Sequence, residues 1–186
     1  MDILNFEQLP LKVLLDTNVV QCLLTFGEYI YDNYLSNKAR RKLRKLPEMI
    51  QNDIEALRSI FGPVTRSPVI PLISELSLHE LSLTGDREKR EALLQWGFDL
   101  LEYSIEIGEF AISSLTPEQT LLSDFLPDKL DRLLIGEYKR TNCQAFITMD
   151  YKTILKFALK LRNGHVNMLS PSEWWTLLEH WWALWV

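Results

Sequence analysis

Residues 11–18 read LKVLLDTN, a short apolar run that ends in an aspartate and two small polar residues. Such a run, with a polar break at its end, is typical of a strand that is buried on both faces of a parallel sheet. From residue 19 to residue 26 the apolar spacing becomes helical. Asp16 is therefore predicted to lie at a strand-to-helix junction, on the edge of the sheet where ligands bind.

A second run of the same kind lies near the other end of the chain. Residues 145–147 read AFI and lead into Thr148, Met149 and Asp150. Because the carboxyl ends of parallel strands meet at one edge of a sheet, we expect Asp16 and Asp150 to face the same crevice, where carboxylates can hold a divalent cation. The structural alternatives are a helix N-cap for Asp16 and a turn residue for Asp150.

Strand-like and helix-like segments alternate along the rest of the chain. We expect strands at residues 69–73, within 110–113 and at 166–169, and helices at 87–101, 127–138 and 153–162. Pro68 and Pro71 weaken the first of these strands, because proline cannot donate a hydrogen bond to a sheet ladder. The alternation predicts an α/β domain in which helices flank a mostly parallel central sheet.

Length and composition indicate one domain. A chain of 186 residues, of which 47% are hydrophobic, is long enough for one well-buried core and short for two, so residues 1–186 are expected to fold as a unit. The first residues lack the basic and apolar regions of a secretory signal. No run approaches the roughly 18 to 20 apolar residues that cross a bilayer, so we expect a cytoplasmic protein with no membrane contact.

Residues 27–66 are predicted to be a helical extension inserted after the first strand-helix unit. Within eight positions it holds six of the 20 basic residues, whereas the rest of the chain has 14 basic and 25 acidic residues. This asymmetry indicates a polyanionic partner, and we expect RNA phosphates to contact the strip. The alternative is a solvated helix face, but the nearest acids, Asp32 and Glu48, are too few to balance it. The basic strip consists of Lys38, Arg40, Arg41, Lys42, Arg44 and Lys45.

Two further acids lie between the strand ends. Glu80 follows the predicted strand at 69–73, but Ser77 stands three residues before it, which is the spacing of a capping box. Glu75 is the substitute if the helix has another register. Asp131 falls inside the apolar arc of the helix predicted at 127–138, where an unpaired acid is costly to desolvate and a cation would relieve that cost.

The alternative for Asp131 is a first-turn acid that the helix dipole favours. Glu137 lies at the opposite side of the same arc and is a lesser candidate, whereas Asp128 is most simply an N-cap. The oxygen donors, with no nearby histidine or cysteine, fit Mg²⁺ or Mn²⁺ better than zinc. Cys22 and Cys143 lie in apolar segments and are expected to be reduced, buried thiols.

The order of these acids resembles the pattern of the PIN-domain family of metal-dependent nucleases. That pattern is a strand followed by Asp-(Thr/Ser)-Asn, a glutamate in the helix after the second strand, an aspartate that opens a later helix, and Thr-x-Asp. The resemblance covers about residues 11–170. It implies a three-layer α/β/α sandwich that hydrolyses RNA with Mg²⁺ or Mn²⁺ and leaves 5′-phosphate and 3′-hydroxyl ends. The implied catalytic and metal-binding residues are Asp16, Glu80, Asp131 and Asp150, with Asn18 and Thr148 in support.

Residues 172–186 contain five of the six tryptophans and are predicted to form a C-terminal helix with a wide apolar face. We expect this face to pack on the parent domain. The alternatives are self-association, which would make a homo-oligomer, and a groove-binding partner. Membrane-surface binding is disfavoured because the polar face has acids and neither lysine nor arginine.

The sequence thus predicts a metal-dependent endoribonuclease. The resemblance also suggests the toxin half of a toxin-antitoxin pair, although the extension at 27–66 departs from the pattern of the small toxins. One rival is a noncatalytic RNA-binding or protein-interaction module on the same fold. Another is a metal-dependent phosphatase of small molecules, which leaves the basic strip unexplained.

Overall fold

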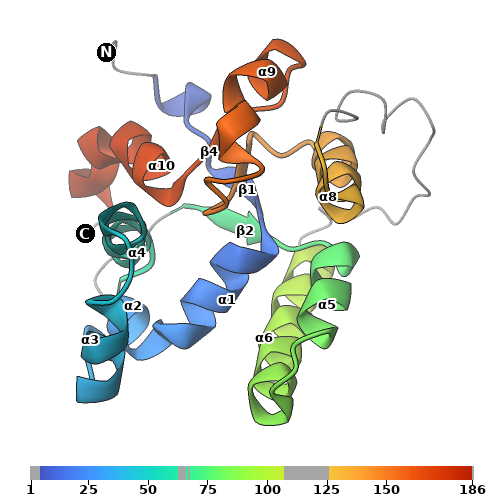
Figure 1. The fold of residues 1–186 in the computed structure, drawn as a ribbon. Helices are drawn as coiled ribbons and strands as arrows, with labels where there is room; N and C mark the ends of the chain where they lie inside the picture. Colours follow the sequence, from blue (N-terminus) through green and yellow to red (C-terminus); the bar gives the residue numbers. More distant parts are fainter. Residues whose placement is uncertain (1–4, 63–65, 67, 107–125, 186) are drawn as a thin grey trace.

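The computed structural model describes residues 5–62, 66, 68–106 and 126–185 (Figure 1). Within them, four short parallel strands form one sheet with the order β2-β1-β3-β4. The α/β class and the parallel sheet are therefore as predicted, whereas the strand expected within residues 110–113 lies outside the described residues. The strands are β1 (Lys12–Leu15), β2 (Ile70–Leu72), β3 (Ala145–Ile147) and β4 (Met168–Leu169).

Strand β1 lies inside the sheet and pairs with both β2 and β3. Leu14 is opposite Leu72 on β2 and Phe146 on β3. Strand β2 pairs with β1 alone among the described strands, and this edge position explains how it accommodates Pro71, since an edge strand needs ladder donors on one side only. Strand β4 is shorter than predicted, at two residues.

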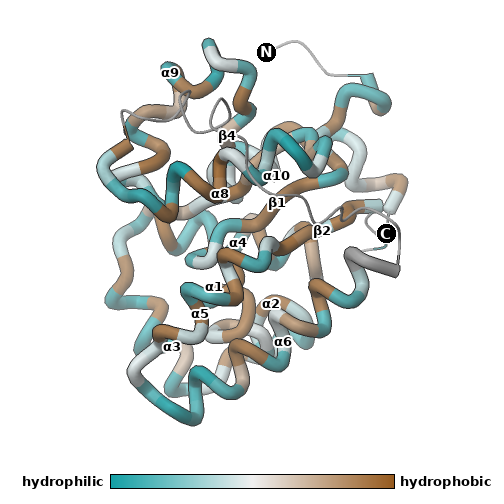
Figure 2. The backbone as a smooth tube through the Cα atoms, turned by 90° about the vertical axis from the view of Figure 1, so that its right-hand side faces the viewer, coloured by the Kyte–Doolittle hydropathy of each residue, from teal (hydrophilic) through white to brown (hydrophobic). Residues whose placement is uncertain are grey.

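Side chains of the strands alternate between the two faces of the sheet and enter two separate hydrophobic clusters. Val13 and Leu15 belong to the larger cluster, whereas Leu14 and Phe146 belong to the other. Figure 2 shows hydrophobic strand residues in the middle of the molecule. Helices therefore flank both faces. The larger cluster includes residues of α1 (Thr17–Thr25), α4 (Glu48–Phe61) and α10 (Pro171–Leu178), and the other includes residues of α8 (Lys129–Arg140) and α9 (Ala158–Asn163).

Most predicted helices are present, with different ends. Helix α6 (Arg87–Glu106) continues past residue 101, but the prediction of a helix at 153–162 is wrong in its first turn. There the Asp150 carboxylate accepts hydrogen bonds from the backbone N–H groups of Lys152 and Thr153, which holds the chain in a turn before a 3₁₀ segment and α9. The remaining elements are η1 (Phe6–Gln8), α2 (Gly27–Asp32), α3 (Asn37–Leu43), α5 (Glu75–Ser82), α6 (Arg87–Glu106), η2 (Leu155–Phe157) and η3 (Glu179–Leu184).

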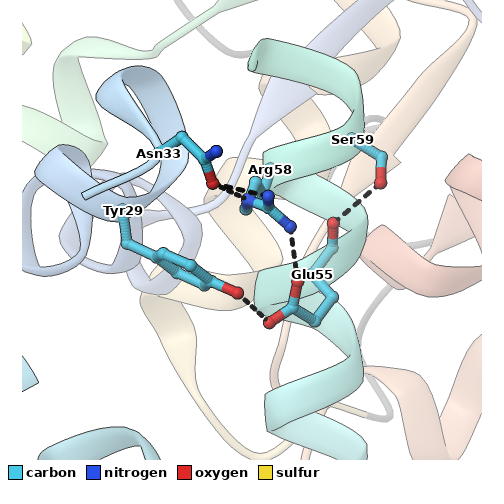
Figure 3. Close-up of polar contacts among 5 residues, drawn as sticks. All are labelled: Tyr29, Asn33, Glu55, Arg58 and Ser59. Carbon is cyan, nitrogen blue, oxygen red and sulfur yellow. Dashed lines mark hydrogen bonds and ion pairs between the residues drawn. The ribbon is translucent and has the colours of Figure 1, made fainter. Parts of the chain in front are cut away.

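The extension at 27–66 is helical, as predicted, and consists of α2, α3 and α4 in its described part. A polar network joins α2 to α4 (Figure 3). The Tyr29 hydroxyl donates to Glu55 Oε1 at 2.5 Å, and Arg58 donates to Glu55 Oε2 at 3.3 Å and to Asn33 Oδ1 at 2.5 Å. Asn33 ends α2 in the left-handed conformation (φ 56°), which asparagine tolerates. The network therefore ties α2 to α4 within the extension.

The tryptophan-rich tail is not one helix, contrary to the prediction. After α10 the chain tightens into the 3₁₀ segment η3, and Trp182 and Trp185 bond to segments outside the tail. The Trp182 indole donates to the Ser59 carbonyl at 3.1 Å, and the Trp185 carbonyl accepts from the Arg66 backbone N–H at 2.5 Å. Trp174 is fully buried and donates to the Pro10 carbonyl at 2.9 Å. The tail thus packs on its own domain, as expected.

Cys22 and Cys143 are buried free thiols, as predicted. In the part of the chain that the structure describes, no helix has the length and apolar character needed to cross a membrane.

Candidate active site

The candidate site lies where β1 and β3 end side by side. Within the sheet, β2 lies on one side of β1 and β3 lies on the other. The connection from β1 to β2 therefore leads away from β3, and a crevice opens between the carboxyl ends of β1 and β3. The Asp16 backbone N–H donates to the Ile147 carbonyl at 2.9 Å, which joins the two strand ends directly. This edge is where the sequence predicted a site.

A pocket of about 370 Å³ occupies this crevice, and all four predicted acids line it. Asp16 comes from the start of α1, Glu80 from α5, Asp131 from the first turn of α8 and Asp150 from the loop after β3. Four segments that are distant in sequence therefore bring carboxylates to one cavity. The other lining residues are Thr17, Asn18, Gln21, Leu83 and Leu130.

Asp16 is the most buried of the four acids, with 4% of its surface exposed. Its Oδ1 accepts from the Thr17 backbone N–H at 2.7 Å, so the predicted N-cap role is real and coexists with the pocket position. The pKa of Asp16 is raised to about 7, mainly by burial. The hydrogen bond from Thr148 opposes this rise, and the nearby carboxylates of Glu80 and Asp131 add to it.

Asn18 and Thr148 clamp Asp16 between the two strand ends. Asp16 Oδ2 accepts from Asn18 Nδ2 at 2.7 Å and from Thr148 Oγ1 at 2.5 Å. The same side chains bond the next loop, because Asn18 Oδ1 accepts from the Met149 backbone N–H and Thr148 Oγ1 accepts from the Asp150 backbone N–H, each at 3.0 Å. Both residues were predicted as supporting groups, and both orient the acids.

Glu80 lies in the middle of α5, so the capping-box alternative is wrong. The helix begins one turn earlier, where the Ser74 hydroxyl accepts from the Ser77 backbone N–H at 3.1 Å. Glu80 Oε2 instead accepts a hydrogen bond from the Thr17 hydroxyl. Glu75 is exposed in the first turn and does not line the pocket. Thr17 is a site residue that sequence reasoning missed, although the Asp-(Thr/Ser)-Asn pattern contains it.

Asp131 is half-buried in the first turn of α8, and Asp128 caps that helix as predicted. The pKa of Asp131 is raised to about 6. Burial is the largest cause, the carboxylates of Asp128, Asp150 and Glu80 add to it, and a hydrogen bond from Thr153 lowers it. The lesser candidate, Glu137, does not line the pocket. It is buried 3.7 Å from the Arg140 guanidinium, in an ion pair.

Asp150 also fulfils its structural alternative. Its Oδ1 accepts from the backbone N–H groups of Lys152 and Thr153 at 2.9 and 2.8 Å, and its Oδ2 accepts from the Thr153 hydroxyl. These bonds fix the carboxylate at the pocket wall. Asp150 is therefore a turn acid whose turn presents it to the other three carboxylates.

The donor set fits a hard divalent cation. Four carboxylates share the pocket, two have raised pKa values, and none of the ion pairs between described residues involves them. The carboxylates are not yet gathered, since no three His, Cys, Asp or Glu side chains of the described residues are close enough to share one ion. Binding of a cation would therefore require these side chains to rotate toward the pocket centre.

The basic strip lies on α3 and the residues after it. All six of its side chains are exposed, so it is a solvated surface as well as a candidate phosphate contact. Comparison of the chain with protein-family models, with curated proteins and with solved structures gives no match.

Proposed function

We propose that the chain is a metal-dependent endoribonuclease with a PIN-like α/β/α sandwich fold. The observation that carries the proposal is the convergence of Asp16, Glu80, Asp131 and Asp150 on one pocket at the carboxyl edge of the sheet. The parallel sheet with helices on both faces is compatible with the three layers that the resemblance implies.

Asp16, Glu80, Asp131 and Asp150 would hold Mg²⁺ or Mn²⁺ in this pocket. When bound, such an ion lowers the pKa of a water molecule and neutralises charge on a phosphodiester, which is the chemistry needed for its hydrolysis. Asn18 and Thr148 keep the Asp16 carboxylate aimed at the pocket and deliver hydrogen bonds that favour its charged form. The Thr17 hydroxyl donates to Glu80 and helps to orient that carboxylate.

The electrostatics favour a cation-binding role over a purely structural one. Burial and mutual repulsion act against the charged forms of Asp16 and Asp131, so keeping these acids costs folding free energy near neutral pH. A bound divalent cation removes that cost. A fold that required only caps at these positions would gain stability from neutral residues.

The noncatalytic RNA-binding module remains the second candidate, and the observation that favours it is the separation of the carboxylates in the described structure. The roles of toxin, antitoxin-bound subunit and homo-oligomer rest only on the family resemblance and on the tryptophan-rich tail. Much of that tail already packs against the chain's own domain, since Trp174 is buried and the Trp182 indole donates a hydrogen bond to α4.

Cleavage of mixed RNAs with Mn²⁺ or Mg²⁺ tests the proposal, with EDTA as the metal-free control. Asp131→Asn should abolish cleavage. Asp128→Asn is the matched control, because Asp128 is exposed, lies three residues away on the same helix and keeps its capping function as asparagine. Metal-dependent cleavage that Asp131→Asn removes and Asp128→Asn retains supports the site. RNA binding without metal-dependent cleavage by the unaltered protein favours the noncatalytic module.

A further inference from the structure

A second pocket, of about 290 Å³, opens beside the acidic pocket. Asn18 and Gln21, which are one turn apart on α1, line both pockets. Beyond them the lining changes from carboxylates to apolar side chains: Phe26 after α1, Ile50 on α4 and Met149 in the loop after β3. The two pockets are therefore parts of one groove along α1, a helix of nine residues that is about 13 Å long.

The far end of this groove is basic. Lys42 of the basic strip lines the apolar pocket, and its Nζ lies 6.0 Å from the centre of the Phe26 ring. The same lysine lines the next hollow, together with Lys38, Arg41 and Lys45. The groove thus changes along its length from carboxylates to apolar side chains and then to cations.

We propose that this groove binds a single RNA strand, with one unstacked base in the apolar pocket and the adjoining phosphates on the basic strip. An RNA strand alternates a flat, largely apolar base with a phosphate anion, which matches an apolar pocket next to lysines. The amide of Gln21 at the pocket mouth can hydrogen-bond to a base edge. A duplex keeps its bases stacked inside, so the pocket selects single strands.

The acidic end of this path rests on the proposed function, because phosphate approaches four carboxylates only with a bound cation. The apolar pocket and the basic strip do not depend on the metal. Base binding is therefore measurable in EDTA, where no metal-dependent cleavage occurs.

Fluorescence anisotropy in EDTA tests the base pocket, with a labelled RNA of about twelve nucleotides and an abasic strand of the same length. Ile50→Gln places an amide in the pocket wall. Met49→Gln is the matched control, because Met49 directly precedes Ile50 on α4, does not line the pocket and is 48% exposed. Ile50→Gln should weaken binding of the base-carrying RNA about fivefold or more and change abasic binding less than about twofold, whereas Met49→Gln should change neither.

Equal weakening of both strands by Ile50→Gln, or no weakening of either, would overturn the base pocket. If Ile50→Gln does not fold, Thr25→Phe gives the same test, because Thr25 is a half-buried lining residue whose larger replacement occludes the pocket. Absence of any RNA binding, as expected of a groove for a protein partner, would also overturn it. Base-selective binding without metal-dependent cleavage would refute the nuclease alone, and cleavage without base-selective binding would refute the base pocket alone.

Discussion

Asp16 and Asp53 are two buried aspartates that hold the same loop, the one that follows β3. Asp16 binds Thr148 at its start, and Asp53, on α4, accepts from the Tyr151 hydroxyl at 2.8 Å near its end. Asp53 is 0% exposed and also accepts from the Ser172 backbone N–H and hydroxyl, at 3.0 and 2.7 Å. Each carboxylate thus has three hydrogen-bond donors.

The difference lies in what else surrounds each carboxylate. Asp53 is enclosed by α4, α10 and the loop, and its pKa is raised first by burial and only last by the carboxylate of Glu173. Asp16 opens into a pocket with Glu80 and Asp131, whose charges oppose its own. A buried acid that donors satisfy and the chain encloses is structural. A buried acid that faces other acids across an open pocket is a candidate for holding a cation.

The first test of this contrast is Asp53→Ala, which should have the largest effect on stability. It leaves the Tyr151 hydroxyl and two donors of Ser172 unpaired, so we expect a loss of about 3 kcal/mol or more in the free energy of unfolding. Urea denaturation measures it. Asp131→Asn, in the pocket, should cost nothing or raise stability in EDTA near neutral pH, because it removes repulsion. Similar losses in both variants would show that the two regions do not differ.

The second test is the pH dependence of stability in EDTA. The pKa of Asp16 is about 7 in the folded protein against an ordinary value of 3.8, and that of Asp131 is about 6. The folded state therefore keeps protons that the unfolded chain has released, so stability falls as pH rises from about 4 through 7. Asp16 alone implies a loss of about 2 kcal/mol in the free energy of unfolding between about pH 5.5 and pH 8.

Saturating Mg²⁺ should reduce this loss, because a cation favours the charged carboxylates. The pKa of Asp53 is also raised by burial, so its share of the slope should remain in Mg²⁺. Thermal unfolding at several pH values, with and without Mg²⁺, measures both parts. Identical pH slopes under the two conditions would mean that the pocket binds no Mg²⁺.

The sequence predicts the acidic pocket around Asp16 but not the enclosed site around Asp53, and the reason is physical. Strand ends mark Asp16 and Asp150, since parallel strands must bring their carboxyl ends together. The helical arc that marks Asp131 marks Asp53 equally, because Ile50, Asp53, Ile54 and Leu57 share one helical stripe. What separates the two acids is the donors of Asp53, which lie 98 and 119 residues away along the chain. No local pattern reports contacts at that distance.

The third test concerns the clamp rather than an acid. Thr148→Val removes the hydroxyl that donates to Asp16 and accepts from the Asp150 backbone N–H, so both acids lose their orientation. We expect about a tenfold loss of Mn²⁺ affinity, the lower end for groups that orient metal ligands. Isothermal titration calorimetry measures it, and Thr148→Ser should restore binding because it keeps the hydroxyl. Failure of serine to rescue would assign the loss to packing.

The smallest effect on stability is expected on the basic strip, whose charges are neither buried nor held by partners in an ion pair of the described residues. Arg41→Ala should change the free energy of unfolding by less than about 0.5 kcal/mol. It should lower the slope of log affinity for RNA against log salt by about one, because one phosphate contact is lost. Arg87→Ala, on the exposed start of α6, is the control and should leave that slope unchanged. Equal slopes for Arg41→Ala and the unaltered protein would mean that the strip is a solvated helix face. The buried carboxylates, rather than the strip, would then be the functionally important charges.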